Sequence, residues 1–148
     1  MAEMLAEMEA KSVAVPGALV IGADQVLELD DGTILSKAGS RGEAADQLRA
    51  LSGRVHQLHS AAAIAEAGTR VWGATESVRM TVRPLGEAFL QAYLDREYED
   101  VRFNVGGYRI EGMGAQLFEK VEGSHFAVLG LPLLPLLAFL RRRGLLAS

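Results

Sequence analysis

The sequence contains no cysteine, which excludes disulfide bonds and any metal site built from thiolates. This absence favours a location inside the cell. A surplus of basic residues is also missing, since 15 Lys and Arg face 19 Asp and Glu and the net charge is -4 at pH 7. A broad nucleic-acid surface needs clustered excess cations. We therefore predict that the chain binds no nucleic-acid polymer.

Long uninterrupted apolar segments are lacking too. The most apolar run, residues 126–140, is broken by Gly130, Pro132 and Pro135, and it is shorter than the roughly 20 residues of a membrane-spanning helix. The N-terminal residues mix acidic with apolar side chains and lack the basic start of a signal peptide. We interpret the run as core and predict no membrane partner. The prolines disfavour the alternative that the leucine-rich tail binds a membrane.

What the chain does have is enough length and apolar content for a buried core. Its 148 residues are 49% hydrophobic and 23% charged, which is ordinary for a globular protein. This length matches one typical domain. We predict a single domain over residues 1–148.

Periodicity of the apolar residues predicts both helices and strands. Helical spacing is found over residues 2–13, 41–52, 84–95 and 132–143. Strand patterns are found over residues 18–23, 54–67, 69–83 and 115–121, and residues 123–130 read as a turn region. Met4, Leu5 and Met8 mark the expected apolar face of the first helix. Asp31-Gly32 predicts a tight hairpin with a two-residue turn.

The strand over residues 18–23 is the centre of the functional interpretation. Its apolar residues predict a strand buried on both faces, as in a parallel or mixed sheet. Asp24 would then lie just past the carboxyl end of that strand, where open α/β sheets bind ligands. Gly22 and Ala23 leave room for another group to approach the backbone. A turn-forming role for Asp24 is the alternative interpretation.

Acidic and basic residues offer the most plausible chemistry. Carboxylates suit Mg²⁺ and a lysine can meet phosphate oxygens, so the combination fits metal-assisted attack on a phosphate ester or anhydride. The three histidines, His56, His59 and His125, show no metal-ligand motif. The candidate residues are Asp24, Lys37 and Glu111, with Arg79, Arg83 and Arg109 as outer cations.

Several segments resemble, in order and spacing, the Maf-like nucleoside triphosphate pyrophosphatases. The segments are V-I-G-A-D-Q (residues 20–25), I-L-S-K (34–37), L-R-A-L-S-G-R-V-H (48–56), A-T-E-S-V-R-M-T-V-R (74–83), G-G-Y-R-I-E-G-M-G-A-Q-L-F-E-K-V-E-G (106–123) and V-L-G-L-P-L (128–133). The resemblance implies an α/β fold, with a mixed sheet flanked by helices. It also implies hydrolysis of a nucleoside triphosphate between its α and β phosphates, with Mg²⁺ or Mn²⁺ as cofactor, in the cytoplasm.

The resemblance also assigns roles to individual residues. Asp24 matches the family's catalytic proton acceptor and possible metal ligand, and Lys37 matches a lysine that meets phosphate. Gln25 and Glu111 fall where the family sets substrate specificity. Glu111 stands where the branch preferring thymidine and uridine triphosphates has glutamine, and it resembles the branch acting on 7-methylguanosine triphosphate.

Three departures from the family pattern motivate a second hypothesis. Ala38 replaces a proline and Asn104 replaces a lysine. The family's first strand and S-x-S-P-R-R loop have no counterpart in residues 1–16, so an N-terminally truncated fold is expected. The alternative is therefore a catalytically impaired nucleotide-binding or interaction protein. Sheet edges left unpaired would favour a homodimer.

Overall fold

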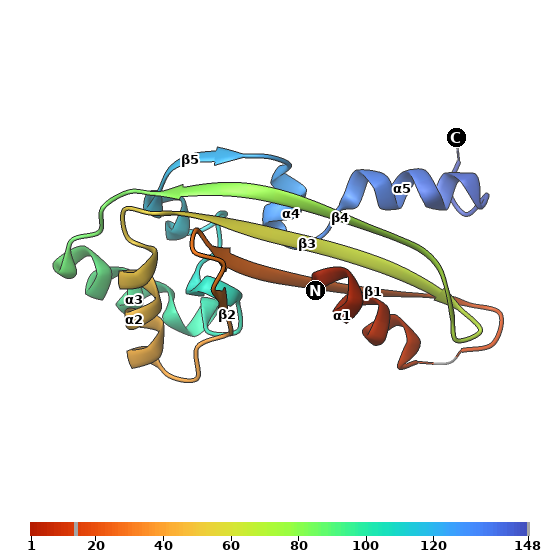
Figure 1. Ribbon diagram of the computed structural model, residues 1–148, viewed down its shortest axis with the longest axis horizontal. Coiled ribbons are helices and arrows are strands. Elements are labelled where there is room, and N and C mark those ends of the chain that lie inside the picture. Colours follow the sequence, from red (N-terminus) through yellow and green to blue (C-terminus); the bar gives the residue numbers. More distant parts are fainter. Residues whose placement is uncertain (14, 148) are drawn as a thin grey trace. The chain divides into compact units, whose positions relative to one another are not determined.

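A computed structural model describes residues 1–13 and 15–147 of the chain (Figure 1). The elements in chain order are α1 (Ala2–Lys11), β1 (Leu19–Leu29), β2 (Ile34–Leu35), α2 (Arg41–Leu51), β3 (Val55–Glu66), β4 (Thr69–Val82), α3 (Glu87–Val101), the 3-10 turns η1 (Val105–Gly107) and η2 (Met113–Leu117), β5 (Phe118–Glu122), α4 (His125–Leu129) and α5 (Leu133–Arg142). The predicted combination of helices and strands, and with it the α/β fold class, is confirmed.

The strands form one antiparallel sheet in the order β2-β1-β3-β4-β5 (Figure 1). The expectation of a parallel or mixed arrangement around β1 was therefore wrong. β1 is also only half-buried, since Ile21 is 48% exposed. An apolar run in an antiparallel sheet can have one face open, so composition alone did not indicate the burial of this strand.

A tight turn connects β1 to β2, as the sequence predicted. The amide of Leu29 donates to the carbonyl oxygen of Thr33 at 2.8 Å, which leaves three residues in the loop rather than the predicted two. Gly32, the last of these three, has φ +88, and glycine adopts this left-handed conformation without the cost a side chain would impose.

The described residues pack into two compact units. Unit 1 contains residues 1–25, 59–77 and 124–148, and unit 2 contains residues 26–58 and 78–123. The chain passes from one unit to the other within β1, β3 and β4 and again after Gly123. The prediction of one domain over residues 1–148 stays a prediction.

In unit 1, α1 packs against β1 through small side chains. Ala2, Ala6 and Ala10 are buried, whereas Met4 is 60% and Met8 62% exposed. The predicted helix is present, but its predicted buried face was wrong. A Cβ added at Gly22 would come within 2.5 Å of the Ala10 nitrogen, so helix and strand are too close at residue 22 for any side chain, even that of alanine. The space that Gly22 leaves is filled by α1.

The remaining core of unit 1 lies between α5 and the adjoining halves of β3 and β4. Ile64, Leu136 and Phe139 are buried together there. Trp72 stacks on Phe139 with ring centroids 5.4 Å apart, an arrangement that buries large apolar area. The interpretation of the leucine-rich run as core therefore holds for the inner face of α5, while Leu134 on its outer face is 60% exposed.

In unit 2, the side chains of Ser40 and Glu43 hydrogen-bond to backbone amides at the start of α2. The Ser40 hydroxyl accepts the amide of Glu43 at 3.2 Å, satisfying one unpaired donor of the first turn. The Glu43 carboxylate accepts the amide of Gly39 at 2.6 Å rather than that of Ser40. These bonds fix the loop that precedes the helix.

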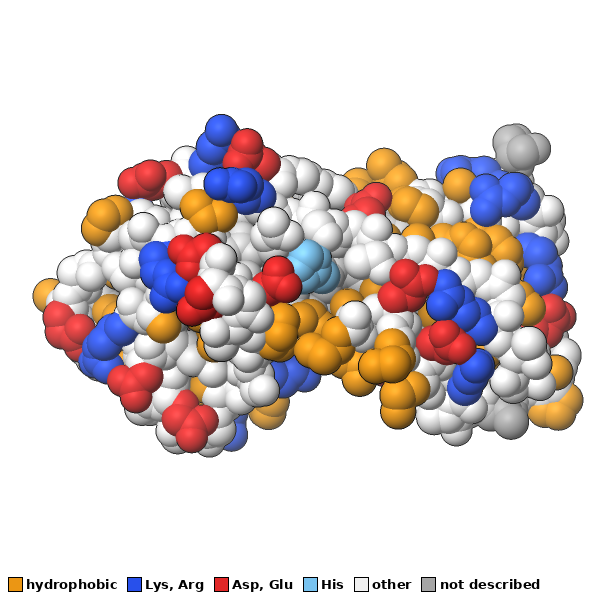
Figure 2. Space-filling view, viewed as in Figure 1, with side chains coloured by type: hydrophobic (Ala, Val, Ile, Leu, Met, Phe, Trp, Pro, Cys, Tyr) orange, Lys and Arg blue, Asp and Glu red, His pale blue; other side chains and the backbone are white. Residues whose placement is uncertain are grey.

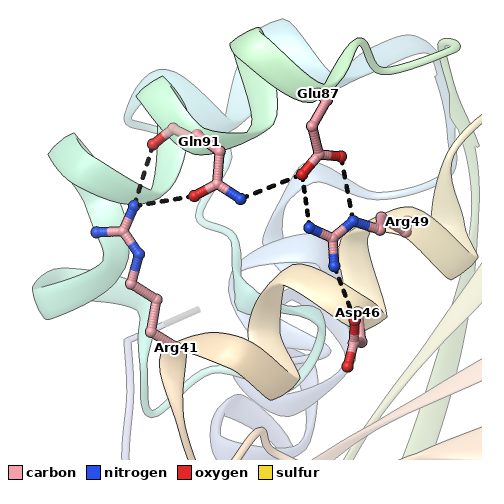
Figure 3. Close-up of polar contacts among 5 residues, drawn as sticks. All are labelled: Arg41, Asp46, Arg49, Glu87 and Gln91. Carbon is pink, nitrogen blue, oxygen red and sulfur yellow. Dashed lines mark hydrogen bonds and ion pairs between the residues drawn. The ribbon is translucent and has the colours of Figure 1, made fainter.

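Polar side chains connect α2 to α3 on the surface of unit 2 (Figure 3). Arg49 donates to both carboxylate oxygens of Glu87, at 3.1 and 2.6 Å, and also pairs with Asp46. Arg41 donates to the backbone carbonyl and side chain of Gln91. Hydrogen bonds from Arg49 and Gln91 lower the pKa of Glu87 to about 2, so this carboxylate stays charged over the physiological range.

The C-terminal part of the sequence prediction needs two corrections. The segment read as a turn region contains α4, and α3 continues to Val101 instead of ending near residue 95. The five residues of α4 are too few for helical periodicity to show. β5 begins at Phe118, three residues later than predicted, because the η2 turn precedes it.

Charges of both signs are interspersed over the face shown in Figure 2, where acidic side chains lie beside basic ones. Ion pairs are also present in unit 1, for example between Arg143 and Glu66 at 2.9 Å. Among the described helices, none has the length and hydropathy needed to cross a membrane.

Candidate functional site

Asp24 lies inside β1 and not beyond its end. The sequence placed it just past a strand ending at Ala23, but β1 continues to Leu29, so that expectation was wrong. The extension follows from the hairpin, because β2 pairs with Leu27 and Glu28 and keeps the strand extended. Asp24 is half-buried, and no described residue of unit 1 forms a hydrogen bond or ion pair with its side chain. Within this unit, its carboxylate is therefore available to bind a ligand.

Gln25 points to the opposite face of β1, since side chains alternate along a strand. Its amide nitrogen lies 3.1 Å from the Ser60 hydroxyl and 3.1 Å from each of the Ala127 and Val128 carbonyl oxygens. The Ser60 hydroxyl donates to the same Ala127 carbonyl at 2.5 Å. Gln25 thus ties β1 to the last turn of α4 within unit 1.

Lys37 belongs to unit 2, in the loop between β2 and α2, and its side chain is exposed. The loop is held on both sides of the lysine. Gln47 of α2 donates to the Ser36 carbonyl at 2.8 Å, and Glu43 accepts the Gly39 amide. No described residue of unit 2 pairs with the Lys37 ammonium, so it is available to an anion.

Glu111 lies in the glycine-rich segment of unit 2, between η1 and η2, with an exposed side chain. This segment, residues 104–114, turns tightly, because Gly106 and Gly107 have φ +80 and +69. Tyr93 of α3 donates its hydroxyl to the Gly107 carbonyl at 2.8 Å. Asn104 donates to the Tyr108 carbonyl at 3.2 Å and so supports the same segment.

The three arginines suggested as outer cations have partners in unit 2. Arg79 pairs with Glu122 at 3.6 Å and Arg83 donates to the Gln116 carbonyl at 2.6 Å. Arg109 pairs with Glu97 and Asp100, each at 3.1 Å. These interactions give all three a structural role.

Glu97 is a residue that the sequence interpretation missed. It is 5% exposed and accepts hydrogen bonds from Arg109 and from the Met113 amide. Its position in the helical pattern could have revealed it, because Leu90, Tyr93, Leu94 and Val101 form the buried face of α3 and Glu97 shares their spacing. A buried carboxylate requires such partners.

His56 supports the glycine-rich segment from β3. Its Nε2 lies 2.8 Å from the Tyr108 hydroxyl, and both side chains are buried. Burial lowers the pKa of His56 to about 4 and raises the pKa of Tyr108 well above its usual value. His56 is therefore neutral in the folded protein at neutral pH, and within the described residues no three His, Asp or Glu side chains converge as metal ligands.

A pH dependence of stability follows from His56. Its pKa is lower in the folded state, so it stabilises the fold above the unfolded value of about 6.5 and this contribution is lost as pH falls towards 4. Between pH 7 and pH 5 the loss is expected to reach about 2 kcal/mol. Urea unfolding at both pH values should show it in the wild type and much less in His56→Gln. Equal pH dependence in both proteins would contradict this assignment.

Two cavities lie within single units. One in unit 1 has a volume of about 420 Å³ and one in unit 2 of about 350 Å³. The first is lined by Gly17, Ala18, Leu19, Ile21, Glu66, Leu140, Arg143 and Leu145, the second by Glu28, Leu29, Asp30, Gly32, Val55, His56, Gln57 and Arg79. Neither cavity is lined by any of the four predicted site residues.

The predicted site residues are thus shared between the units, with Asp24 and Gln25 in unit 1 and Lys37 and Glu111 in unit 2. Lys37 and Glu111 each sit on a segment that is hydrogen-bonded to a helix of unit 2, which fixes their backbones. The common cleft expected for Asp24, Lys37 and Glu111 stays a prediction.

Comparison with known proteins gives consistent matches over nearly the whole chain. The profile of a family described as Maf-like protein matches residues 1–143. A protein of Sphingopyxis alaskensis is 46% identical over 146 residues, covering 97% of this chain and 74% of the relative. One of Nitrobacter hamburgensis is 51% identical over 136 residues, covering 92% and 67%. Both relatives carry the name nucleoside triphosphate pyrophosphatase.

Proposed function

The chain belongs to the Maf-like family, and we propose that it is a nucleoside triphosphate pyrophosphatase whose preferred substrate is 7-methylguanosine triphosphate. The proposed reaction rests on the close similarity to relatives that are named for this activity and are 46% to 51% identical over most of the chain. The unpaired Asp24 carboxylate and Lys37 ammonium support it, since each is free within its unit to meet a ligand.

In the proposed reaction, water attacks the α-phosphorus of the nucleotide. Asp24 takes a proton from the attacking water, a new oxygen–phosphorus bond forms, and the bond from the α-phosphorus to the bridging oxygen breaks. Pyrophosphate leaves with the electron pair of that bond, and the nucleoside monophosphate remains. Lys37 would neutralise negative charge on the phosphate oxygens. This charge increases on the leaving pyrophosphate as the bond breaks.

A divalent cation fits this chemistry with few protein ligands. Mg²⁺ is commonly bound by one or two carboxylates together with substrate phosphates and waters, rather than by an all-protein cage. Asp24 is the carboxylate that would hold it. Such a cation would supply positive charge to the triphosphate oxygens.

The proposed preference for a methylated guanine nucleobase rests on Glu111. A carboxylate accepts hydrogen bonds only, and guanine offers N–H donors on its pairing edge. Methylation at N7 also gives the ring a positive charge that a carboxylate balances. An amide at this position offers a donor as well as an acceptor, which suits the donor and acceptor pattern of thymine or uracil.

We expect the protein with Mg²⁺ to release pyrophosphate from 7-methylguanosine triphosphate faster than from thymidine or uridine triphosphate. Glu111→Gln should shift the kcat/KM ratio towards the pyrimidine nucleotides by about tenfold or more, because the acceptor pair is replaced. Glu99→Gln, an exposed carboxylate on α3 that pairs with Arg102, serves as the control and should leave the ratio unchanged. Pyrophosphate release over this nucleotide panel is the measurement.

Each outcome of the panel is informative. Release from none of the nucleotides would overturn the enzymatic proposal. Nucleotide binding by calorimetry without turnover would then favour the noncatalytic alternative. If pyrophosphate is released but the kcat/KM ratio is unchanged in Glu111→Gln, the proposed reaction stands and Glu111 is not the residue that sets specificity.

A further inference from the structure

Glu97 is a charged side chain buried inside unit 2, and both of its carboxylate oxygens are used. Oε1 accepts the Met113 amide at 2.5 Å, and Oε2 accepts the Arg109 Nε at 3.2 Å. A second guanidinium nitrogen of Arg109 lies 3.1 Å from the same Oε2. With 5% exposure, this carboxylate has little access to water, so these three contacts carry its hydrogen bonding.

The two partners of Glu97 flank Glu111 in the sequence. Arg109 precedes it by two residues and Met113 follows it by two. The Gly112 amide also donates to the Arg109 carbonyl at 3.3 Å, which closes the turn. Glu97 therefore holds both ends of the five-residue turn that carries Glu111.

The backbone packs too closely at Gly112 and at the following Gly114 for either residue to carry a side chain. A Cβ at Gly112 would lie 2.6 Å from the Glu97 Oε1, and a Cβ at Gly114 would lie 2.9 Å from the Arg109 carbonyl carbon. One turn earlier on α3, Tyr93 holds the Gly107 carbonyl. Two successive turns of one helix thus anchor the glycine-rich segment.

We propose that Glu97 is a positioning residue for base selectivity, which acts by fixing the 109–113 turn so that the Glu111 carboxylate meets the purine base. This inference rests on the proposed function of Glu111. Glu97 does not contact the nucleotide in this scheme. Its effect on selectivity passes through the backbone of the turn.

The test compares Glu97→Gln with the wild type. The side-chain amide of glutamine has one acceptor oxygen and one donor nitrogen. The Met113 amide and the Arg109 guanidinium are both donors, so the nitrogen would face a donor and one of the two contacts would be lost. A displaced turn should raise KM for 7-methylguanosine triphosphate and reduce its kcat/KM preference over thymidine triphosphate by about tenfold. The kcat should change less, because Asp24 is untouched.

Two further measurements separate positioning from general damage. The Met113 amide should exchange its hydrogen faster in Glu97→Gln, which NMR can follow in the free protein. In a Glu111→Gln background, Glu97→Gln should change the nucleotide ratio no further, because the side chain through which it acts is gone. Asp95→Asn, an exposed carboxylate of α3 paired with Arg41, is the matched control and should match the wild type in both assays.

Arg109→Lys provides a second route if Glu97→Gln does not fold. Lysine keeps the positive charge beside Glu97 but lacks the planar guanidinium group. This variant should also lower the kcat/KM preference for 7-methylguanosine triphosphate. A selective wild type with an equally selective Glu97→Gln would overturn this inference and leave the proposed function intact. An equal change of selectivity on introducing Glu97→Gln into the wild type and into Glu111→Gln would also overturn this inference and leave the proposed function intact. A wild type that hydrolyses none of the nucleotides would overturn both.

Discussion

Asp24→Asn is expected to reduce the rate of pyrophosphate release by about 100-fold or more. The proposed role of Asp24 is to accept a proton from the attacking water, and a neutral amide cannot do so. The same change weakens any contact with a divalent cation, because it removes the negative charge. Steady-state release of pyrophosphate with saturating Mg²⁺ is the measurement.

The structure favours an intact fold in this variant. Asp24 is half-buried, and no described residue of unit 1 pairs with its side chain, so asparagine breaks no contact there. Glu76→Gln is the matched control, since Glu76 is a half-buried carboxylate on β4 in the same unit. It should retain full activity. An Asp24→Asn protein that retains more than about a tenth of wild-type activity would remove Asp24 as the base.

Gly22→Ala is expected to destabilise the protein by about 3 kcal/mol, at the upper end of the usual cost of overpacking. The added methyl would overlap the Ala6 carbonyl oxygen and approach the Ala10 nitrogen to 2.5 Å. Both are backbone atoms of α1, so no side-chain rotation can relieve the clash. The helix must move away from β1, and the small contacts of its three buried alanines are then lost. The midpoint of urea unfolding is the measurement.

Gly42→Ala is the control for this prediction. Gly42 lies in α2, and the nearest atom to an added Cβ is the Ser40 hydroxyl at 3.8 Å, an ordinary contact distance. Alanine there should raise stability by about 0.5–1 kcal/mol, because it loses less backbone freedom on folding. Equal midpoints for Gly22→Ala and the wild type would show that α1 does not rest on Gly22 in solution.

The elements with strong local signals could be predicted from the sequence. The helical spacing of residues 41–52 predicted α2, and the strand pattern of residues 69–83 predicted β4. Local patterns failed where long-range packing decides. The buried face of α1 is its alanine face because β1 comes so close at Gly22, a distance that the helix sequence does not encode.

Asp24, Lys37 and Glu111 were singled out by their charge and position in the sequence, and the family resemblance added Gln25 and the individual roles. Asp24 was placed after a strand because the apolar run of residues 18–23 stops there, whereas β1 continues to Leu29 and pairs with β2. Gln25 proved to be bonded to α4, a helix too short to anticipate. Glu97 was overlooked because a carboxylate on the inner face of a helix reads as ordinary surface charge until its partners are seen.

The alternation of the chain between the units limits how the protein can be divided. Unit 1 is assembled from three stretches of sequence and unit 2 from two. No single deletion or pair of end points in the gene can yield one complete unit by itself, because β1, β3 and β4 each contribute residues to both units. Experiments with isolated fragments would therefore have to rejoin separate stretches with new linkers, or express them as complementing pieces.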